Sequence, residues 1–409
     1  MKTLIRRSIQ FYKKNNLQYI LIRILYKILV LISGIFLSPI SIICFINNFR
    51  ILKIDTARIG HFSIEPDIIL KGERLGFLKK RKYIILIQDN KNTNQHLKNY
   101  WKQYFTIIDN KFIVFLFNGI SIFKYINFDT KFIINADENS QYAYLINKSW
   151  GQRPPTLTIS NTDEQWGQNL LKSLGLKDGQ WFVCMHARDP YYSKFDEKIQ
   201  SYRNSSINNL SLSVQEIKSR GGIAIRVGTS SREIPIIDGL IDYPNGIYKS
   251  DRADLYLLAK ARFIVGNTSG IALLGSVFGT PCALANMIPM SVMGIGINDI
   301  TIPKLLMENK RVLSFNEVMN SDIANYRYTS NYNDNLIIPI ENDEEDIFQL
   351  TLEMLEKLDG CIHDEEGKNM QEKFKMLLKP NHYGFGASSN ISLNFLKKYI
   401  NLLVKNGTN

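Results

Sequence analysis

Apolar residues along the second half of the chain fall into short runs, each ending at small or polar residues. Such runs occur at Trp181–Met185, Ile223–Ile225, Phe263–Val265 and Cys282–Ala285. Strands buried on both faces of a parallel sheet have this near-continuous apolar pattern. Between the runs, apolar residues recur at helical spacing, for example Leu210, Val214 and Ile217. The pattern therefore predicts alternating strands and helices, without hairpin signals.

The first half shows the same alternation. Strands are predicted at Ile51–Ile54, Ile68–Leu70, Tyr83–Ile87 and Phe105–Ile108, with a helix at about residues 94–104. Arg58–His61 would form the loop after the first strand. Gly60 would allow a tight turn there and leave His61 at the strand-end face.

The tail is predicted to be helical. Three apolar series have helical spacing, and we expect Ser388 to cap the last helix. The series are Ile347, Leu350, Met354 and Leu358; Met370, Phe374 and Leu377; and Ile391, Phe395 and Tyr399.

These elements predict an α/β protein with four parts. A basic and apolar segment occupies residues 1–50, and two α/β domains occupy 51–165 and 166–345. Residues 346–409 form C-terminal helices. Residues 150–168, with Pro154-Pro155 and many small polar residues, are interpreted as a linker.

The N-terminal segment has an uncharged run of 19 residues, Ile28–Ile46, interrupted by Ser38-Pro39. Basic residues precede it, and no cleavage site for a signal peptide is evident. Three interpretations remain open. The run is a single transmembrane span, a helix pair broken at Pro39 that enters one leaflet with its basic flanks on anionic headgroups, or a buried helix of the fold.

Composition narrows the classes of partner. The 409 residues carry a net charge of +12, which suits nucleic acid, anionic lipid or phosphate-bearing substrates. No nucleic-acid-binding motif is present, so we expect no nucleic-acid partner. The four cysteines lack metal or redox spacing and the five histidines are scattered. We therefore predict no metal site and a reducing compartment.

Polar residues follow the predicted strands of the second half. His186, Arg188 and Asp189 follow the first strand, and Arg226 and Gly228 follow the next. In an open parallel sheet, ligands bind at the carboxyl ends of the strands. An arginine fork holds phosphate oxygens at two points, so these positions predict an anion site.

A helix start adds to this site. Asn267, Thr268, Ser269 and Gly270 lie between a strand and a predicted helix. The free N–H groups and the dipole of a helix start attract anions, although the same residue types also serve as ordinary helix caps. Together with Arg188 and Arg226, the turn predicts a diphosphate clamp.

Candidates for a general base lie in both halves. His61 and Glu65 belong to the first half, while Asp189 and Asp196 belong to the second. A base must reach the proton that it removes. A purely structural role for His61, His186 or Arg226 is an open alternative. No dinucleotide-binding or Walker A motif follows a strand, which disfavours both enzyme classes.

The order of these motifs resembles a group of bacterial glycosyltransferases linked to surface-polysaccharide synthesis. The resemblance covers roughly residues 50–330. It rests on Arg58–His61, Met185–Asp189, Tyr192, Tyr202–Asn204, Ile225–Gly228 and Phe263–Gly270. The His-x-Arg group is more distantly similar to that of fucosyltransferases, in which the arginine contacts the donor diphosphate.

The resemblance implies a GT-B architecture with two Rossmann-like domains, the acceptor on the first and the nucleotide-sugar on the second. It also implies catalysis without a bound metal and no cofactor beyond the substrate. The expected activity is transfer of a sugar from a nucleotide-sugar to a lipid-linked or surface-glycan acceptor. Because such a donor is cytosolic, we favour leaflet attachment, as a peripheral or monotopic protein on the cytoplasmic face of the inner membrane. A nucleotide-sugar epimerase and a non-catalytic carbohydrate-binding or assembly protein are the alternatives.

Overall fold

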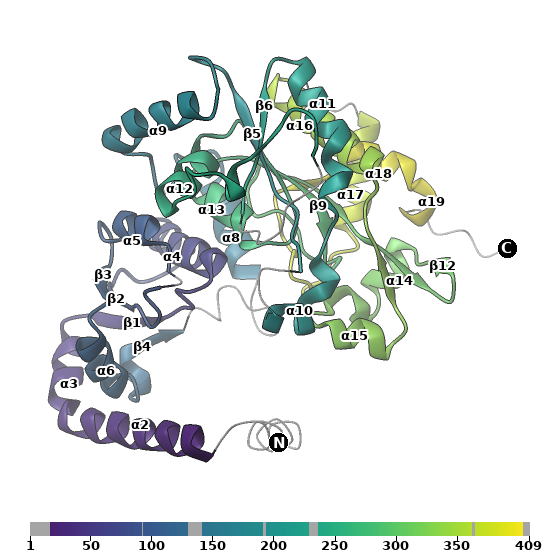
Figure 1. Ribbon diagram of the computed structural model, residues 1–409. Coiled ribbons are helices and arrows are strands. Elements are labelled where there is room, and N and C mark those ends of the chain that lie inside the picture. The colour runs from purple at the N-terminus through teal and green to yellow at the C-terminus, as the bar shows by residue number, and fades with distance from the viewer. Residues whose placement is uncertain are drawn as a thin grey trace. The chain divides into compact units, whose positions relative to one another are not determined.

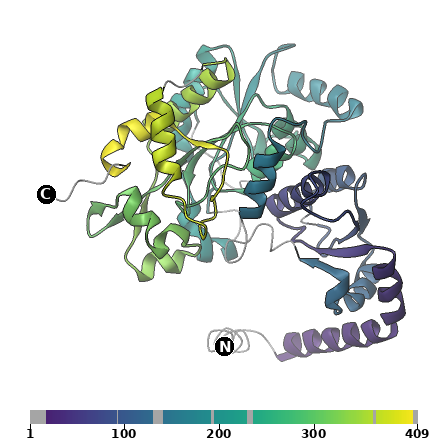
Figure 2. The ribbon, with the colours of Figure 1, turned by 180° about the vertical axis from the view of Figure 1, so that it is seen from behind.

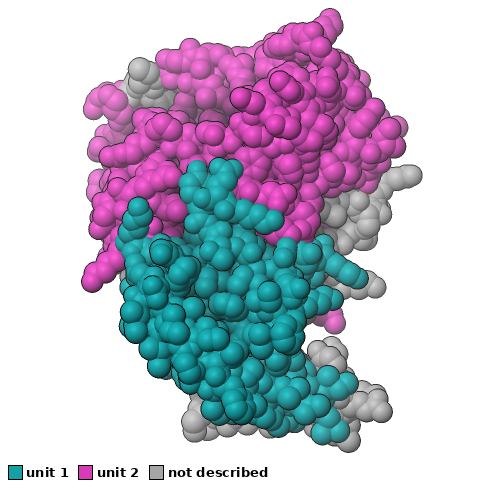
Figure 3. Space-filling model, turned by 90° about the vertical axis from the view of Figure 1, so that its left-hand side faces the viewer, with its two compact units in different colours: residues 1–57, 80–93, 101–130 teal, residues 58–79, 94–100, 131–409 magenta. Residues whose placement is uncertain are grey.

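The computed structural model describes residues 17–91, 93–129, 141–190, 194–228, 236–361 and 365–403. The basic residues before position 17, and Tyr192, lie outside these ranges. The chain forms two compact units, coloured separately in Figure 3. Unit 1 contains residues 1–57, 80–93 and 101–130, and unit 2 contains 58–79, 94–100 and 131–409.

Unit 1 is built on a four-stranded parallel sheet in the order β3-β2-β1-β4. Its core is a cluster of buried aliphatic side chains, which includes Ile51 and Ile84 of the sheet and Val114 of α6. Helices α2, α3 and α6 lie together in this unit (Figure 1). Its elements are α2 (Leu17–Phe36), α3 (Ser38–Ile46), β1 (Phe49–Lys53), β2 (Lys82–Leu86), β3 (Thr106–Ile108), α6 (Lys111–Ile120), η1 (Lys124–Ile126) and β4 (Asn127–Asp129).

Unit 2 contains a seven-stranded parallel sheet in the order β14-β10-β9-β8-β5-β6-β7. Strands β5, β8 and β9 are fully buried, as their apolar runs predicted. The strands are β5 (Phe182–Met185), β6 (Ile223–Arg226), β7 (Leu240–Asp242), β8 (Ile264–Gly266), β9 (Cys282–Met287), β10 (Ile300–Pro303) and β14 (Asn390–Ile391).

Unit 2 is rich in helices, of which α11, α13 and α16 contact strands of this sheet and α18 contacts both α16 and α17 (Figures 1 and 2). They are α4 (Ile59–Arg74), α5 (Gln95–Trp101, except its last residue), α8 (Gln141–Trp150), α9 (Asn161–Ser173), α10 (Lys194–Gln200), α11 (Ser211–Ser219), α12 (Asp251–Lys260), α13 (Gly270–Val277), α14 (Phe315–Met319), α15 (Thr329–Asp334), α16 (Glu344–Leu358), α17 (Glu365–Lys375), α18 (Leu393–Lys398) and α19 (Ile400–Leu403). Short 3-10 helices are η2 (Ser201–Arg203), η3 (Ile207–Leu210), η4 (Tyr243–Asn245) and η5 (Asp322–Asn325).

The α/β class and the parallel sheets agree with the prediction from the sequence. The four-part division into 1–50, 51–165, 166–345 and 346–409 stays a prediction. Packing places α4, from the predicted first domain, in unit 2.

Two predictions in the first half were wrong. Ile68–Leu70 is not a strand, and Arg58–His61 is not a loop, because α4 runs from Ile59 to Arg74. Nearly all of α4 after its first turn is buried, so its apolar residues show no amphipathic stripe. Pro66 lies inside the helix, and because proline disfavours a helix interior, the sequence alone does not predict a helix here.

Three further predictions need correction. The linker at 150–168 contains the start of α9, where Ser160 caps the helix by accepting from the Asp163 N–H. Ser392, not Ser388, caps α18. The second half does contain antiparallel strands, since β11 (Leu305–Glu308) pairs with β12 (Arg311–Val312) and with β13 (Ile338–Ile340).

The first of these antiparallel pairs turns at Asn309-Lys310, which both have positive φ, of 49° and 64°. This is the conformation of a two-residue hairpin turn that usually carries glycine at its second position. Lysine there removes the usual sequence signal.

Candidate functional site

The carboxyl edge of the large sheet collects the residues predicted to bind a ligand. Strand β5 lies between β8 and β6 in parallel register, and His186 N–H continues the ladder to Val265 O over 2.8 Å. His186, Arg188, Gly228 and Asn267 therefore follow neighbouring strand ends in unit 2. The predicted convergence of these positions is present in the fold.

His186 is fixed at this edge as a neutral side chain. Burial lowers its pKa to about 4, assisted by the charge of Arg226 and opposed by the bond to Val227. Its Nδ1 lies 3.1 Å from Val227 O. Gly228 leaves room for this ring, because a Cβ there would stand 2.7 Å from Nδ1, and its φ of +113° also favours glycine. His186 thus positions backbone and brings no positive charge at neutral pH.

Arg188 is buried and bound to the segment at residues 200–204. Its Nη1 donates to Gln200 O over 3.3 Å and to the Asn204 side-chain oxygen, and it lies 3.9 Å from a Glu197 oxygen. Arg226, also buried, forms an ion pair with Asp242 on the adjacent strand β7. Both predicted arginines therefore already have protein partners.

The segment 200–205 is held from several sides. Lys304, buried after β10, donates to Asn204 O over 2.6 Å, and Tyr202 OH donates to Arg327 O over 2.7 Å. The Asn267 amide donates to Arg203 O over 3.2 Å. Burial lowers the pKa of Lys304 to about 8. These bonds fix the backbone on both sides of one arginine, Arg203.

Arg203 reaches the turn before α13. Its Nε donates to Thr268 O over 2.8 Å, and Nη2 donates to the same carbonyl. Its Nη1 donates to Gln200 Oε1 over 2.5 Å. Burial, together with the nearby charges of Arg188 and Arg58, lowers the pKa of Arg203 to about 10. Within the part of the chain that the structure describes, no carboxylate forms an ion pair with this guanidinium, although the charge of Asp196 acts on it.

Two helices begin beside this arginine. Gly60, in the first turn of α4, packs on Gly270, the first residue of α13: a Cβ on Gly60 would stand 2.8 Å from Gly270 Cα. A Cβ on Gly270 would stand 2.7 Å from Gly60 N. No side chain caps α4, and Ser269 caps α13 over 3.4 Å to Ile271 N. The positive ends of two helix dipoles therefore meet.

Arg58 precedes α4 and adds a partly exposed cation. Its Nη2 lies 2.8 Å from Asp196 Oδ1, and 39% of the side chain is exposed. Asp196, a candidate base, is thus engaged in an ion pair and is 7% exposed. Asp189 is half-buried, and its charge acts on His186.

His61 and Glu65 form a pair on α4. His61 Nδ1 lies 2.5 Å from Glu65 Oε1, with the carboxylate buried and 46% of the imidazole exposed. A carboxylate on one ring nitrogen fixes the orientation of the ring and favours an acceptor at the other nitrogen. The sequence named both residues, and the helix, rather than a loop, brings them together.

Reasoning from sequence missed Arg203 as a site residue. It follows no strand, and the Tyr202–Asn204 group entered only as part of a resemblance. A signal for its position exists only in the fold, where Lys304, Asn267 and Arg188 converge on one short segment.

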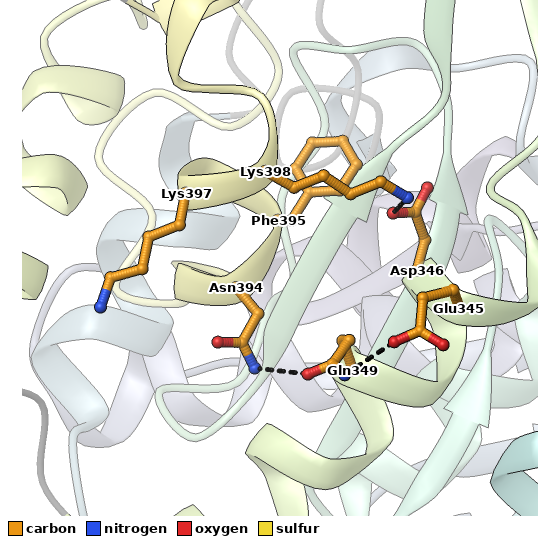
Figure 4. Close-up of a pocket in the computed structure, with 7 residues that line it drawn as sticks. All are labelled: Glu345, Asp346, Gln349, Asn394, Phe395, Lys397 and Lys398. Atoms are coloured by element: carbon orange, nitrogen blue, oxygen red, sulfur yellow. Dashed lines mark hydrogen bonds and ion pairs between the residues drawn. The ribbon is translucent and has the colours of Figure 1, made fainter.

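A cavity of about 270 Å³ lies elsewhere in unit 2, between α16 and α18 (Figure 4). Its lining is dominated by ion pairs, such as Lys398 to Asp346 over 2.7 Å, and by hydrogen bonds of side-chain amides. None of the candidate residues lines it. Across the described residues, no group of three or more His, Cys, Asp and Glu side chains is placed to hold a metal ion.

The chain matches no protein-family model and no curated protein. Its fold is similar to that of several solved glycosyltransferases. The ADP-heptose lipopolysaccharide heptosyltransferase II of E. coli is 10% identical, with 76% of this chain and all of that chain covered and a TM-score of 0.43. The iron-containing dodecameric glycosyltransferase TibC of enterotoxigenic E. coli is 11% identical, with 76% of each chain covered and a TM-score of 0.39.

A glycosyltransferase of family 9 from Veillonella parvula is also 11% identical, with 73% of this chain and 80% of that chain covered and a TM-score of 0.32. Likeness at these TM-scores assigns neither a family nor an activity.

Proposed function

We propose that this protein is a glycosyltransferase that takes a sugar from a nucleotide-sugar and passes it to a glycan or lipid-linked acceptor. The observation that carries the proposal is Arg203. Arg203 is partly buried, and the groups that accept its hydrogen bonds, Thr268 O and Gln200 Oε1, are neutral. A cation withdrawn from water in this way is costly unless an anion completes its environment. The diphosphate of a nucleotide-sugar is such an anion, and two oxygens of a phosphate group accept together from a guanidinium fork.

The surroundings of Arg203 support a diphosphate rather than a single carboxylate. Two helix starts meet at Gly60 and Gly270, and Arg58 stands before one of them. Backbone N–H groups at helix starts bind phosphate oxygens. In this proposal Arg203, Arg58 and residues 267–270 contact the diphosphate. Arg188, Arg226, His186 and Gly228 hold the surrounding backbone in place.

The proposed reaction breaks the bond between the sugar's anomeric carbon and the donor's phosphate oxygen. A bond then joins that carbon to the acceptor oxygen. Negative charge grows on the leaving diphosphate, and preorganised cations and N–H groups stabilise it most in the transition state. His61, oriented by Glu65, removes the acceptor proton through its exposed ring nitrogen. Asp189 is the alternative base.

Several parts of this proposal extend beyond the site. We propose that the two parallel sheets belong to the two halves of a GT-B enzyme. We also propose that arginines and helix starts, without a metal, balance the negative charge of the leaving diphosphate. The acceptor is one of bacterial surface-polysaccharide synthesis. The protein then works at the cytoplasmic face of the inner membrane, as a peripheral or monotopic enzyme.

The first test concerns Arg203. A panel of nucleotide-sugars is screened by thermal shift, since a donor raises the melting temperature by mass action. Nucleoside diphosphate release is then measured with the donor that binds. Arg203→Ala should abolish the shift and lower kcat/KM by a factor of about 10² or more, because a charge-assisted contact in the transition state is lost.

Arg203→Lys should recover only part of this loss, because an ammonium lacks the fork. The matched control is Arg311→Ala, which removes an exposed arginine on β12 that pairs with Glu317 of α14. Circular dichroism checks that each variant is folded. Full donor binding and transfer by folded Arg203→Ala would exclude the proposed site.

A further inference from the structure

The surface formed by α2, α3 and α6 of unit 1 is unusually apolar. Large hydrophobic side chains on all three helices are exposed, among them Ile22, Phe36, Ile43, Ile46, Phe112 and Ile113. Phe36 is 80% exposed, Ile46 74% and Phe112 68%. Scattered exposed hydrophobics are ordinary, but so many on three helices that contact one another indicate a binding surface.

The charged residues on these three helices have one sign. The first acidic residue of the chain is Asp55, so the first 54 residues carry only basic charges. Arg23 and Lys27 lie on α2, Lys111 begins α6, and none of the three helices contains an acid. An apolar face with basic residues among it matches the anionic surface of a bilayer.

The contact between α2 and α6 is made by small residues. A Cβ on Gly34 would stand 2.5 Å from Gly119 O, and one on Gly119 would stand 2.8 Å from Gly34 N. The Tyr26 and Phe115 rings add an edge contact at 5.8 Å. Close backbone approach through glycine is how helices associate in lipid, where burying apolar side chains gives little gain.

The geometry of unit 1 argues against a simple span. No single described helix is long and apolar enough to cross a membrane, whereas Ile20–Phe36 and Ser38–Ile46 pass that test together, with a bend of 61° between them. The second of these helices ends at Ile46, and β1 of the sheet begins at Phe49.

Helix α6 is tied to the sheet at both ends, by β3 before it and by η1 and β4 after it. Its ten residues are about 15 Å long, half the hydrocarbon thickness of a bilayer. Because α2 packs on α6, α2 shares its shallow position.

We propose that α2, α3 and α6 together form a monotopic anchor that lies in one leaflet of an anionic bilayer. The proposal goes beyond an N-terminal attachment, because α6 comes from the middle of the α/β unit and fixes which face of unit 1 meets the lipid. It does not depend on the chemistry of the enzyme.

The test uses the full chain and sealed vesicles, either of phosphatidylcholine alone or of phosphatidylcholine with phosphatidylglycerol at about 3:1. We expect flotation with the anionic vesicles and weaker flotation with the neutral ones, with the difference lost at high salt. Phe112→Glu with Ile113→Glu should lower the membrane partition by about tenfold or more, since two embedded side chains become charged. The control is Ile247→Glu in unit 2, an equally apolar residue that is 90% exposed.

Topology is tested with single cysteines at position 2 (Lys2→Cys) or 53 (Lys53→Cys), in a chain whose Cys44 and Cys361 are changed to Ser. An impermeant maleimide is added outside vesicles to which the protein has bound. Labelling of both positions supports an anchor in one leaflet, and protection of position 2 alone would show a span and overturn it. Absence of flotation, or flotation that the α6 variant leaves unchanged, also overturns the proposal. The same holds if the α6 variant instead dissociates a dimer seen by light scattering.

Discussion

Arginines at the carboxyl edge of the large sheet differ in what balances their charge. Arg226 has Asp242, and Arg58 has Asp196. Arg203 has a backbone carbonyl and an amide oxygen. A ligand anion gains most from a cation whose charge is not already neutralised, and burial strengthens that interaction. The distinction depends on partners rather than on residue type, so a motif containing arginine does not reveal it.

The pair formed by His61 and Glu65 leads to a prediction about the proton. His61→Ala should lower kcat by about 10² to 10⁴, the usual contribution of a general base, with little change in donor affinity. Glu65→Gln should cause a smaller loss, because the ring is still present but less firmly oriented. Steady-state kinetics with separate variation of donor and acceptor measure both effects.

Chemical rescue separates catalysis from structure. Free imidazole should restore part of the transfer by His61→Ala, since it supplies the missing base. If imidazole has no effect and the variant melts well below the parent protein, His61 is a structural residue and Asp189 becomes the candidate base.

How far the sequence predicts the site follows from where each residue lies relative to a strand. His186, Gly228 and Asn267 follow apolar runs, and strand-end placement put them at one edge. His61 and Glu65 were named for the wrong reason, a loop, and their i,i+4 spacing on a helix explains the contact. Arg203 depends on long-range packing, which no local pattern contains.

The sequence predicted helices that bury one face and strands that are completely buried. Short apolar runs gave β1, β2, β5, β6, β8 and β9. Helix α4 was missed because a helix buried all round resembles a strand run, and Pro66 strengthens that impression. Strands β10 and β14 lie within polar or irregular sequence, and only pairing in the sheet defines them.

At the scale of elements, Asp163 connects α5, α9 and α12. It accepts from Tyr100 OH over 2.5 Å, from His96 over 2.9 Å and from Arg252 over 2.7 Å, and it is 5% exposed. Although burial opposes ionisation, these hydrogen bonds lower the pKa of Asp163 to about 2. Its ordinary value is about 3.9. The ionised carboxylate therefore stabilises the folded state by about 2–3 kcal/mol, a contribution present above pH 4.

Asp163→Asn should remove this stabilisation. Because the folded pKa is the lower one, the contribution is lost as the pH falls from about 4 to 2. The variant should thus be less stable than the parent by about 2–3 kcal/mol at pH 5–7. Urea unfolding at several pH values should show the difference shrinking towards pH 2.5. Asp178→Asn, at an exposed surface pair, serves as the control. A difference that does not change with pH would contradict the assignment.

In the whole molecule, the candidate anion site and the apolar helical surface belong to different units. All described residues of the candidate anion site lie in unit 2, whereas the apolar helices α2, α3 and α6 lie in unit 1. The basic excess of the chain serves both, because phosphate groups of a donor and of lipid headgroups attract the same side chains. Binding of a soluble anion and binding of a bilayer are therefore distinguishable by where the chain becomes protected.

Hydrogen exchange tests this separation. UDP, GDP and ADP are added in turn, and the one that raises the melting temperature is used for the measurement. We expect slower exchange at the first turns of α4 and α13, because ligand oxygens accept from N–H groups that the helices leave without intrahelical partners. Strands β1 and β2 of unit 1 should exchange as before. At a nucleotide concentration that saturates the parent protein, Arg203→Ala should abolish this protection, while Arg311→Ala should keep it. Protection that appears in unit 1 but not at α4 and α13 would place the nucleotide elsewhere and remove the basis for a donor site at the meeting of these two helices.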